Sequence, residues 1–152
     1  MVKSFTGVRK APEKNVAQAL AVRDFMTRQL TTFKPSQSIG EVVKIMINKK
    51  ISGGPVLDEA GKLVGIISEG DCLKEIVRGR YSHSPNNTGV VADHMVRDVK
   101  TIDPDTSVFD AAQLFLNSRV RRFPVLEDDK LIGQISQRDV MRAIDQLKDS
   151  TW

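Results

Sequence analysis

The sequence predicts an α/β (α+β) protein in which one small unit of helices and strands occurs twice. Three observations lead to this fold class. The chain repeats its apolar and turn patterns almost from end to end, 40% of its 152 residues are hydrophobic, and only 5% are aromatic. This composition is ordinary for a globular protein, and it predicts an aliphatic core. A chain of this length supports one good core or two small ones that depend on each other.

The N-terminal residues 1–15 carry basic side chains, Gly7 and Pro12, without an apolar period. This pattern predicts an extended or mobile arm, and a solvated tail is favoured over a segment that wraps onto a partner. Apolar residues then recur at helical spacing from Val16 to about Thr27, which predicts a helix there.

The repeat begins inside this helix and can be followed element by element. Each copy has a helix with an apolar stripe, capped by Ser38 in the first and by Ser107 in the second. An acidic hairpin turn follows in both, at 58–61 and, one residue shorter, at 127–129. The other matched segments are 22–26 and 91–95, 31–35 and 100–104, 54–57 and 123–126, and 63–65 and 131–133.

Each copy therefore reads helix, short strand, helix, strand, strand, helix, and repetition of this completeness is a strong signal. We expect repeats at 16–79 and 91–148, a linker loop at 80–90 and a C-terminal tail at 149–152. One copy is too small to bury both faces of its sheet, so the two should pack sheet to sheet about a pseudo-two-fold axis. The last helix of each copy should bury its apolar residues, which are Cys72, Leu73, Ile76 and Val77 in the first copy and Val140, Met141, Ile144 and Leu147 in the second.

The chain is organised around a strand-to-helix junction that it contains twice, at 65–71 and 133–139. Both copies have a glycine, a serine three residues later and an aspartate three residues after that. The free N–H groups at a helix start suit phosphate, and an aspartate beside them could accept hydrogen bonds from the two hydroxyls of a ribose. Together these features suggest a nucleotide.

The alternative interpretation of this junction is a capping box. There the serine satisfies an unpaired N–H and the acid favours the positive end of the helix. Ser38 with Glu41 and Ser107 with Asp110 have the same spacing and are interpreted as caps only. What distinguishes the junctions at 65–71 and 133–139 is the whole repeated unit around them.

The order of elements, with Pro-Val-Leu before a Gly-x-Ile-Ser-x-x-Asp junction and the tandem pairing, resembles a tandem cystathionine-β-synthase (CBS) domain pair, or Bateman module. The resemblance covers about residues 22–147. It implies two pseudo-two-fold-related β-α-β-β-α units packed sheet to sheet, with clefts for adenosine-containing ligands such as AMP, ATP, NAD or S-adenosylmethionine. It also implies a homodimer.

The resemblance assigns roles to residues at the matching positions of both copies. One acid in each copy would bind ribose hydroxyls, one serine would contact phosphate, and the backbone of the short strand with an apolar neighbour would line an adenine slot. These residues are Asp71 and Asp139 for ribose, Ser68 and Ser136 for phosphate, and Thr32, Thr101, Ile51 and Val120 for adenine.

The two copies differ just before Pro-Val, where the family commonly has a basic side chain that reaches phosphate. The second copy offers Arg119, Arg121 and Arg122, whereas the first has Gly53 and Gly54. Arginine forks onto phosphate oxygens with charge-assisted bonds. The glycines either let backbone approach a ligand or ease a turn. We expect one good site using Arg121 or Arg122 and a second that is weaker or empty; Arg119 is either a ligand or a solvated helix-end cation.

Other chemistry finds little support in the sequence. Around His83 and His94 no spacing resembles a metal site, Cys72 has no partner base, and no catalytic residues are predicted. The net charge of +4 is mild and argues against nucleic-acid binding. We expect no membrane span and no leader peptide. The single cysteine favours a reducing compartment, the cytoplasm.

The sequence therefore predicts a non-enzymatic regulatory module that senses an adenine nucleotide. Ligand binding would stabilise one setting of the two halves by population shift, and the signal would pass to an unidentified protein in trans or through the homodimer. The alternative is a dimerisation scaffold without ligand, in which Ser68, Asp71, Ser136 and Asp139 act only as caps. A nucleotide-processing enzyme is disfavoured because no general base or metal constellation is present.

Overall fold

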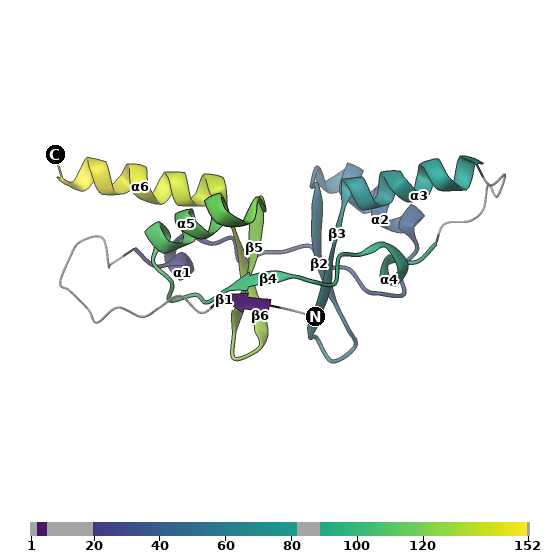
Figure 1. Cartoon of the computed structure of the whole chain (residues 1–152), viewed down its shortest axis with the longest axis horizontal. Coiled ribbons are helices and arrows are strands. Elements are labelled where there is room, and N and C mark those ends of the chain that lie inside the picture. Colours follow the sequence, from purple (N-terminus) through teal and green to yellow (C-terminus); the bar gives the residue numbers. More distant parts are fainter. Residues whose placement is uncertain (1–2, 6–19, 82–88, 152) are drawn as a thin grey trace. The chain divides into compact units, whose positions relative to one another are not determined.

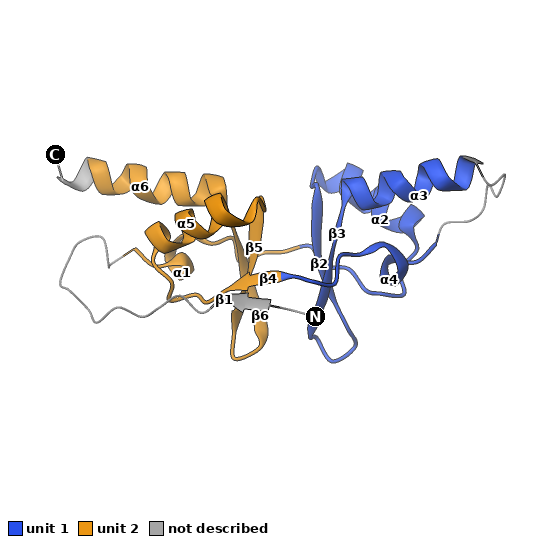
Figure 2. Ribbon diagram, in the orientation of Figure 1, with its two compact units in different colours: residues 1–2, 31–99 blue, residues 3–30, 100–152 orange. Residues whose placement is uncertain are grey.

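The structure is a computed structural model, and it describes residues 3–5, 20–81 and 89–151 (Figure 1). Side chains are described for 20–80 and 89–148. The chain divides into two compact units, coloured separately in Figure 2. Unit 1 is the described part of Thr31–Val99, and unit 2 is the described part of Lys3–Leu30 and Lys100–Trp152. Both mix helices with a small sheet, so the predicted α+β class is confirmed.

Unit 1 is built on a β-hairpin covered by helices. Strands β2 and β3 pair antiparallel, and Phe33 adds a parallel bridge to Val56 of β2. The elements are α2 (Ile39–Lys49), β2 (Gly53–Leu57), β3 (Leu63–Ser68), α3 (Glu69–Tyr81) and α4 (Val91–His94). The core is formed by Phe33, Ile39, Val42, Met46, Val56, Ile67, Cys72, Val91 and Met95.

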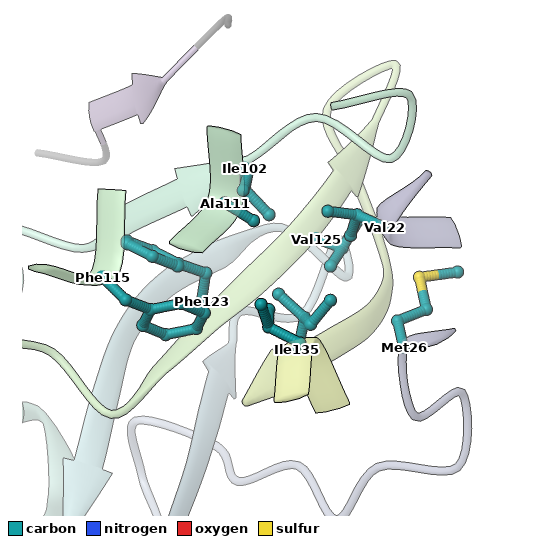
Figure 3. Close-up of a cluster of buried hydrophobic side chains, with 9 residues drawn as sticks. Val22, Met26, Ile102, Ala111, Phe115, Phe123, Val125 and Ile135 are labelled. Atoms are coloured by element: carbon teal, nitrogen blue, oxygen red, sulfur yellow. The ribbon is translucent and has the colours of Figure 1, made fainter. Parts of the chain in front are cut away.

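Unit 2 has the same plan as unit 1, but among the described residues its sheet has four strands and that of unit 1 has two. Its strands lie in the order β1-β4-β5-β6, with β1 and β5 parallel to β4 and β6 antiparallel to β5. The elements are β1 (Lys3–Phe5), α1 (Val22–Phe25), β4 (Lys100–Ile102), α5 (Val108–Ser118), β5 (Arg122–Glu127), β6 (Lys130–Ser136) and α6 (Gln137–Thr151). In its core, the rings of Phe115 and Phe123 lie 4.6 Å apart between centroids (Figure 3). The other core residues are Val22, Met26, Ile102, Ala111, Val125, Ile135 and Val140.

The compact units cross the boundaries of the sequence repeats. The segment that opens each repeat packs in the unit formed by the other repeat. Thr27 exchanges two backbone hydrogen bonds with Gln134, of 2.8 and 2.9 Å, and Val96 exchanges two with Ile66, of 2.8 and 2.9 Å. The paired polar backbone groups are thereby satisfied across a long sequence separation.

A methionine from each exchanged segment fits against a strand glycine. An added Cβ at Gly133 would lie 2.7 Å from Met26 Sδ, and one at Gly65 would lie 2.6 Å from Met95 Sδ. Any residue larger than glycine at position 65 or 133 would require the methionine to move. The glycine that opens each repeated junction is therefore explained by packing.

Several local predictions can be compared with the described residues. The serine caps of α2 and α5 are confirmed, because Ser38 Oγ accepts from Glu41 N and Ser107 Oγ accepts from Asp110 N, each at 3.1 Å. The helix predicted from Val16 to about Thr27 is confirmed only in part, because α1 covers Val22–Phe25 and Leu20 is not helical; residues 6–19 lie outside the described residues. The short strand β1 was not predicted.

The ends of the predicted segments also differ from the observed elements. Helix α3 runs to Tyr81, past the start of the predicted linker, and α6 extends to Thr151 through the predicted tail. Residues 82–88 of the linker lie outside the described residues. The domain bounds as a whole stay a prediction.

The expected burial of the helix stripes is wrong at several positions. On α3, Leu73, Ile76 and Val77 are more than half exposed, although Cys72 is buried. Met141 of α6 is 63% exposed, and Ile47 of α2 and Leu116 of α5 are exposed as well. A helix in a unit this small packs one face against the sheet, so a second apolar face is left uncovered within the unit.

Candidate functional site

The predicted serine and aspartate of unit 1 meet at the junction of β3 and α3. Asp71 Oδ2 accepts hydrogen bonds from Ser68 N and Ser68 Oγ, both at 2.9 Å, and Ser68 Oγ lies 3.4 Å from Asp71 N. Both residues are half-buried. Among the described residues, none donates a hydrogen bond to Asp71 Oδ1. We call Ser68 and Asp71 the unit 1 junction.

The corresponding pair in unit 2 has the same backbone pattern and one further contact. Asp139 Oδ2 accepts from Ser136 N at 2.8 Å, and Ser136 Oγ accepts from Asp139 N at 3.1 Å. In addition, the Arg142 guanidinium forms an ion pair with Asp139 Oδ1. Asp139 is only 6% exposed. We call Ser136 and Asp139 the unit 2 junction.

These bonds are those of a capping box, which was the alternative interpretation of the motif. The serine–aspartate pair closes the first turn of α3 and of α6 and satisfies N–H groups that a helix start leaves unpaired. Capping leaves the second carboxylate oxygen of Asp71 without a donor, so it does not exclude a ligand at the unit 1 junction.

A pocket of about 310 Å³ lies in unit 1 where α2 ends and α3 begins. It is formed by apolar side chains from α2, the turn after it and one acid at the start of α3. Its lining residues are Met46, Ile47, Lys50, Ile51, Ser52 and Glu69. Ile51 was predicted to line an adenine slot, whereas Lys50, Ser52 and Glu69 were not predicted. Ser52 and Glu69 are brought together by a hydrogen bond of 2.9 Å from Glu69 N to Ser52 O. The two residues are far apart in sequence, so no local sequence pattern predicts this contact.

The two glycines of the first copy have a structural explanation. Both lie within strand β2, so the suggestion that they ease a turn is wrong. An added Cβ would lie 2.5 Å from Ile67 O at Gly53, and 2.6 Å from Thr31 O at Gly54. These are backbone contacts, and a side chain would force the neighbouring strands apart. The close approach that the glycines permit is therefore to the protein's own backbone.

The arginines of the second copy are exposed at the end of α5 and the start of β5. Arg119 caps α5 with a left-handed φ of 54°, as Lys50 caps α2 with a φ of 55°. Within the described part of the chain, the side chains of Arg119, Arg121 and Arg122 form no hydrogen bond or ion pair. Three unpaired guanidinium groups within four residues produce a local positive potential that suits an anion.

The remaining predicted residues lie in different environments. Thr32 is exposed, and Thr101 is fully buried in β4. Val120 is half-buried against the unit 2 core, and its carbonyl lies 3.4 Å from Gln137 Nε2. The part of these three residues in an adenine slot stays a prediction, and Thr101 has no exposed surface within unit 2.

The side chains outside the junctions show no catalytic arrangement in the described ranges. Burial, and secondarily the charge of Asp71, raises the pKa of the Cys72 thiol, which makes it a poor nucleophile. No group of His, Cys, Asp and Glu suited to a metal ion occurs among the described residues. His94 lies 3.1 Å from the buried carboxylate of Glu75, and His83 lies outside the described residues.

No described helix combines the length and apolar character required to cross a membrane.

Comparison with known proteins defines the class to which this fold and its paired junctions belong. The CBS domain model matches the chain twice, at residues 22–78 and 91–146. The chain belongs to the CBS domain family, as a tandem CBS pair.

Particular members of the family show how far the similarity extends. The chain is 33% identical to the CBS domain-containing protein CBSX2, chloroplastic, of Arabidopsis thaliana, covering 92% of this chain and 69% of that protein. It is 30% identical to the uncharacterized protein MJ1426 of Methanocaldococcus jannaschii, covering 84% of this chain and 92% of that one.

Two solved structures contain ligands. The crystal structure of CBSX2 in complex with AMP matches with a TM-score of 0.74 at 36% identity, covering 85% of this chain and 98% of that one. The CBS domain pair of protein MJ0100, in complex with 5-methylthioadenosine and S-adenosyl-L-methionine, matches with a TM-score of 0.69 at 28% identity, covering 84% and 97%. Both structures hold adenosine-containing ligands.

Proposed function

We propose that this CBS pair is a regulatory module that binds an adenosine-containing nucleotide and acts as a ligand sensor. One observation carries the proposal: a Ser-x-x-Asp junction recurs in both units, and Asp71 retains a carboxylate oxygen without a donor among the described residues. An unpaired, half-buried carboxylate oxygen is suited to accept hydrogen bonds from ribose hydroxyls. The same oxygen is not required for the cap.

The chemistry of the surrounding residues supports the same ligand class. The unit 1 pocket combines apolar side chains for a base with Ser52 and Lys50 for polar contacts. In unit 2, Arg121 and Arg122 are unpaired and offer charge for phosphate. The AMP complex of CBSX2 and the complex of MJ0100 with two adenosine derivatives support adenosine as the common part of the ligand. We propose AMP, ATP, NAD and S-adenosylmethionine as candidates.

The experiment is thermal unfolding of the purified chain with a panel of adenosine, AMP, ATP, NAD and S-adenosylmethionine, and with GMP as the control nucleotide. A ligand that binds only the folded state raises the melting temperature in a concentration-dependent manner. Native mass spectrometry of freshly purified protein would show any retained ligand and the subunit count together. If GMP and AMP raise the melting temperature equally, or if no member of the panel does so, the proposal is wrong.

A second candidate function, a homodimerisation scaffold without ligand, is favoured by two observations. The junction bonds satisfy the helix starts without any ligand. Both units also expose apolar side chains at matching positions, Leu73 and Met141 on the last helices and Ile47 and Leu116 on the earlier ones. A second copy of the chain would cover such a repeated surface through an isologous contact. Dimerisation is compatible with sensing, and only the nucleotide panel separates the two functions.

The proposed module acts without catalysis of its own. It transmits ligand occupancy to an unidentified protein in trans or through its dimer, by stabilising one conformation over another. Incubation with ATP and Mg²⁺ should yield no product above the level without protein. The single, buried cysteine supports a reducing compartment, which we propose to be the cytoplasm.

A further inference from the structure

Arg142 distinguishes the two junctions chemically. In unit 2 its guanidinium pairs with Asp139 Oδ1, the oxygen that corresponds to the unpaired Oδ1 of Asp71. The residue at the position of Arg142 in the first repeat is Lys74, which is exposed and forms no ion pair with Asp71 in the described structure. The two aspartates therefore share their Oδ2 bonds and differ at Oδ1.

A ribose diol needs the oxygen that Arg142 occupies. In both junctions Oδ2 already accepts the backbone N–H of the serine, at 2.9 Å in unit 1 and 2.8 Å in unit 2. In unit 2 the Arg142 guanidinium pairs with the other oxygen, Asp139 Oδ1. Asp139 as a residue is 6% exposed, whereas Asp71 is half-buried. A ribose at Asp139 has to displace the arginine, and one at Asp71 displaces no side chain of the described residues.

The arginine is able to move away. Its side chain is 61% exposed and holds Asp139 from one turn along the same helix. The guanidinium end of this pair is open to water although Asp139 is buried, so the arginine can exchange Asp139 for solvent and the contact competes with a ligand without blocking it completely.

We propose that Arg142 is a site-selecting residue that competes with ribose for Asp139, so that the first adenosine-type ligand is bound through Asp71. The inference rests on the proposed nucleotide function and adds to it an order of occupancy. It also revises the expectation that the better site is the one nearest the arginines, because phosphate contacts from Arg121 and Arg122 do not free Asp139 Oδ1.

The experiment is calorimetric titration with adenosine, which has the ribose and lacks phosphate, and in parallel with AMP. Four chains are compared: wild type, Arg142→Ala, the matched control Lys74→Ala, and Asp71→Asn combined with Arg142→Ala. We expect Arg142→Ala to add a second adenosine site, or to tighten the weaker one roughly fivefold, the factor that corresponds to loss of a surface ion pair. Lys74→Ala should leave adenosine binding unchanged, and the double variant should retain only the newly strengthened site.

The outcomes separate this inference from the proposed function. If the wild type binds adenosine or AMP and Arg142→Ala leaves adenosine unchanged or weakens it, Arg142 does not compete and the inference is overturned. Weakening of AMP alone would identify Arg142 as a phosphate ligand, which also overturns it. If neither chain binds any adenosine compound, both proposals fail; if only Arg142→Ala binds, the wild type has no first site at Asp71, so the order of occupancy is overturned together with the sensor function. Circular dichroism of each variant checks that α6 remains folded.

Discussion

The unpaired arginines of unit 2 make a prediction about phosphate at the scale of single residues. Replacing Arg121 and Arg122 together by alanine removes two exposed guanidinium groups that support no described contact. Charge-assisted bonds contribute about 1.5–3 kcal/mol each, so the AMP affinity of the unit 2 site should fall at least about tenfold while its adenosine affinity stays within about twofold. Titration calorimetry with both ligands measures this.

A charge-matched control separates local contacts from long-range attraction. Lys44 and Lys130 are exposed and lie on α2 and β6, and their double replacement by alanine removes the same net charge. The lysine variant should retain AMP affinity at physiological salt, where screening limits long-range attraction to about 8 Å. Equal loss of AMP and adenosine in the arginine variant would contradict a phosphate role.

Cys72 should be unreactive in the folded protein. The residue is 3% exposed, and burial raises the pKa of its thiol, so at neutral pH less thiolate is present than in a free cysteine. We expect an aromatic disulfide reagent to label the native chain at pH 8 at least about tenfold more slowly than a model thiol, and to label it rapidly once denaturant is added. Rapid labelling of the native chain would show that α3 opens readily.

At the scale of elements, the contact between α3 and α4 includes a buried acid–imidazole pair beside the apolar contacts of Cys72 and Val91. Glu75 is 3% exposed and His94 Nε2 lies 3.1 Å from its Oε2. Unit 2 has Ala143 and Phe25 at the same positions of the repeat. His94→Phe alone leaves the buried carboxylate with Arg78, at 3.9 Å, as its one ion-pair partner among the described residues, and should lower the free energy of unfolding by about 3 kcal/mol.

Restoring the apolar pair of unit 2 should recover most of that loss. The double variant Glu75→Ala with His94→Phe removes both charges and should unfold within about 1 kcal/mol of wild type, because replacing a buried pair by apolar groups is often neutral. Urea denaturation of the two single variants and the double variant gives the coupling energy. Additive losses would show that the pair does not act as a unit.

The junction glycines give a second prediction for the elements. Gly65→Ala places a Cβ 2.6 Å from Met95 Sδ and 2.9 Å from the backbone oxygen of Val96, so it should destabilise the fold by about 1–3 kcal/mol. Gly133→Ala should do the same, because its Cβ would lie 2.7 Å from Met26 Sδ and 2.9 Å from Thr27 O. Melting temperature and urea midpoint measure both.

Gly70 is the matched control for these substitutions. It lies in the first turn of α3, where an added Cβ finds only Ser68 Oγ, at 3.8 Å. Gly70→Ala should therefore be neutral or stabilise the helix by up to about 1 kcal/mol. Destabilisation of all three variants to the same extent would mean that the close contacts at Gly65 and Gly133 have no energetic weight.

At the scale of the whole molecule, the sequence predicts which helices and strands form. It does not predict which unit the opening segment of each repeat packs into. Local signals such as the caps at Ser38 and Ser107 were sufficient for the helix starts, and the repeat was sufficient for the fold class. The exchange of opening segments was not predictable, because the bonds of Thr27 to Gln134 connect residues far apart in sequence and leave no periodic pattern.

The candidate site was predictable to a similar degree. The serine and aspartate of each junction are three residues apart in sequence, and the structure brings them together. The ion pair of Arg142 with Asp139 was missed, although its spacing of three residues on a helix is a local signal. Whether an apolar helix face is covered depends on what packs against it, so the exposure of Leu73 and Met141 could not be predicted from helical periodicity.

Those exposed faces lead to the prediction for the assembly, a homodimer that covers the last helices. Replacing Leu73 and Met141 together by glutamate puts charge on side chains that are 59% and 63% exposed in the single chain. The fold should persist, since neither side chain belongs to a core cluster, while association should weaken because burying a charge in an apolar contact is costly. Sedimentation velocity should show a dimer for wild type and a monomer for the variant.

The control for this experiment is Val96→Glu, which adds charge to an apolar residue that is 50% exposed outside the helices. It should remain dimeric with an unchanged melting temperature at the same protein concentration. The double variant should lose the concentration dependence of its melting temperature, because a dimer is stabilised by mass action and a monomer is not. A wild-type chain that sediments as a monomer would overturn the homodimer, and retention of the dimer in the double variant would place its interface away from Leu73 and Met141.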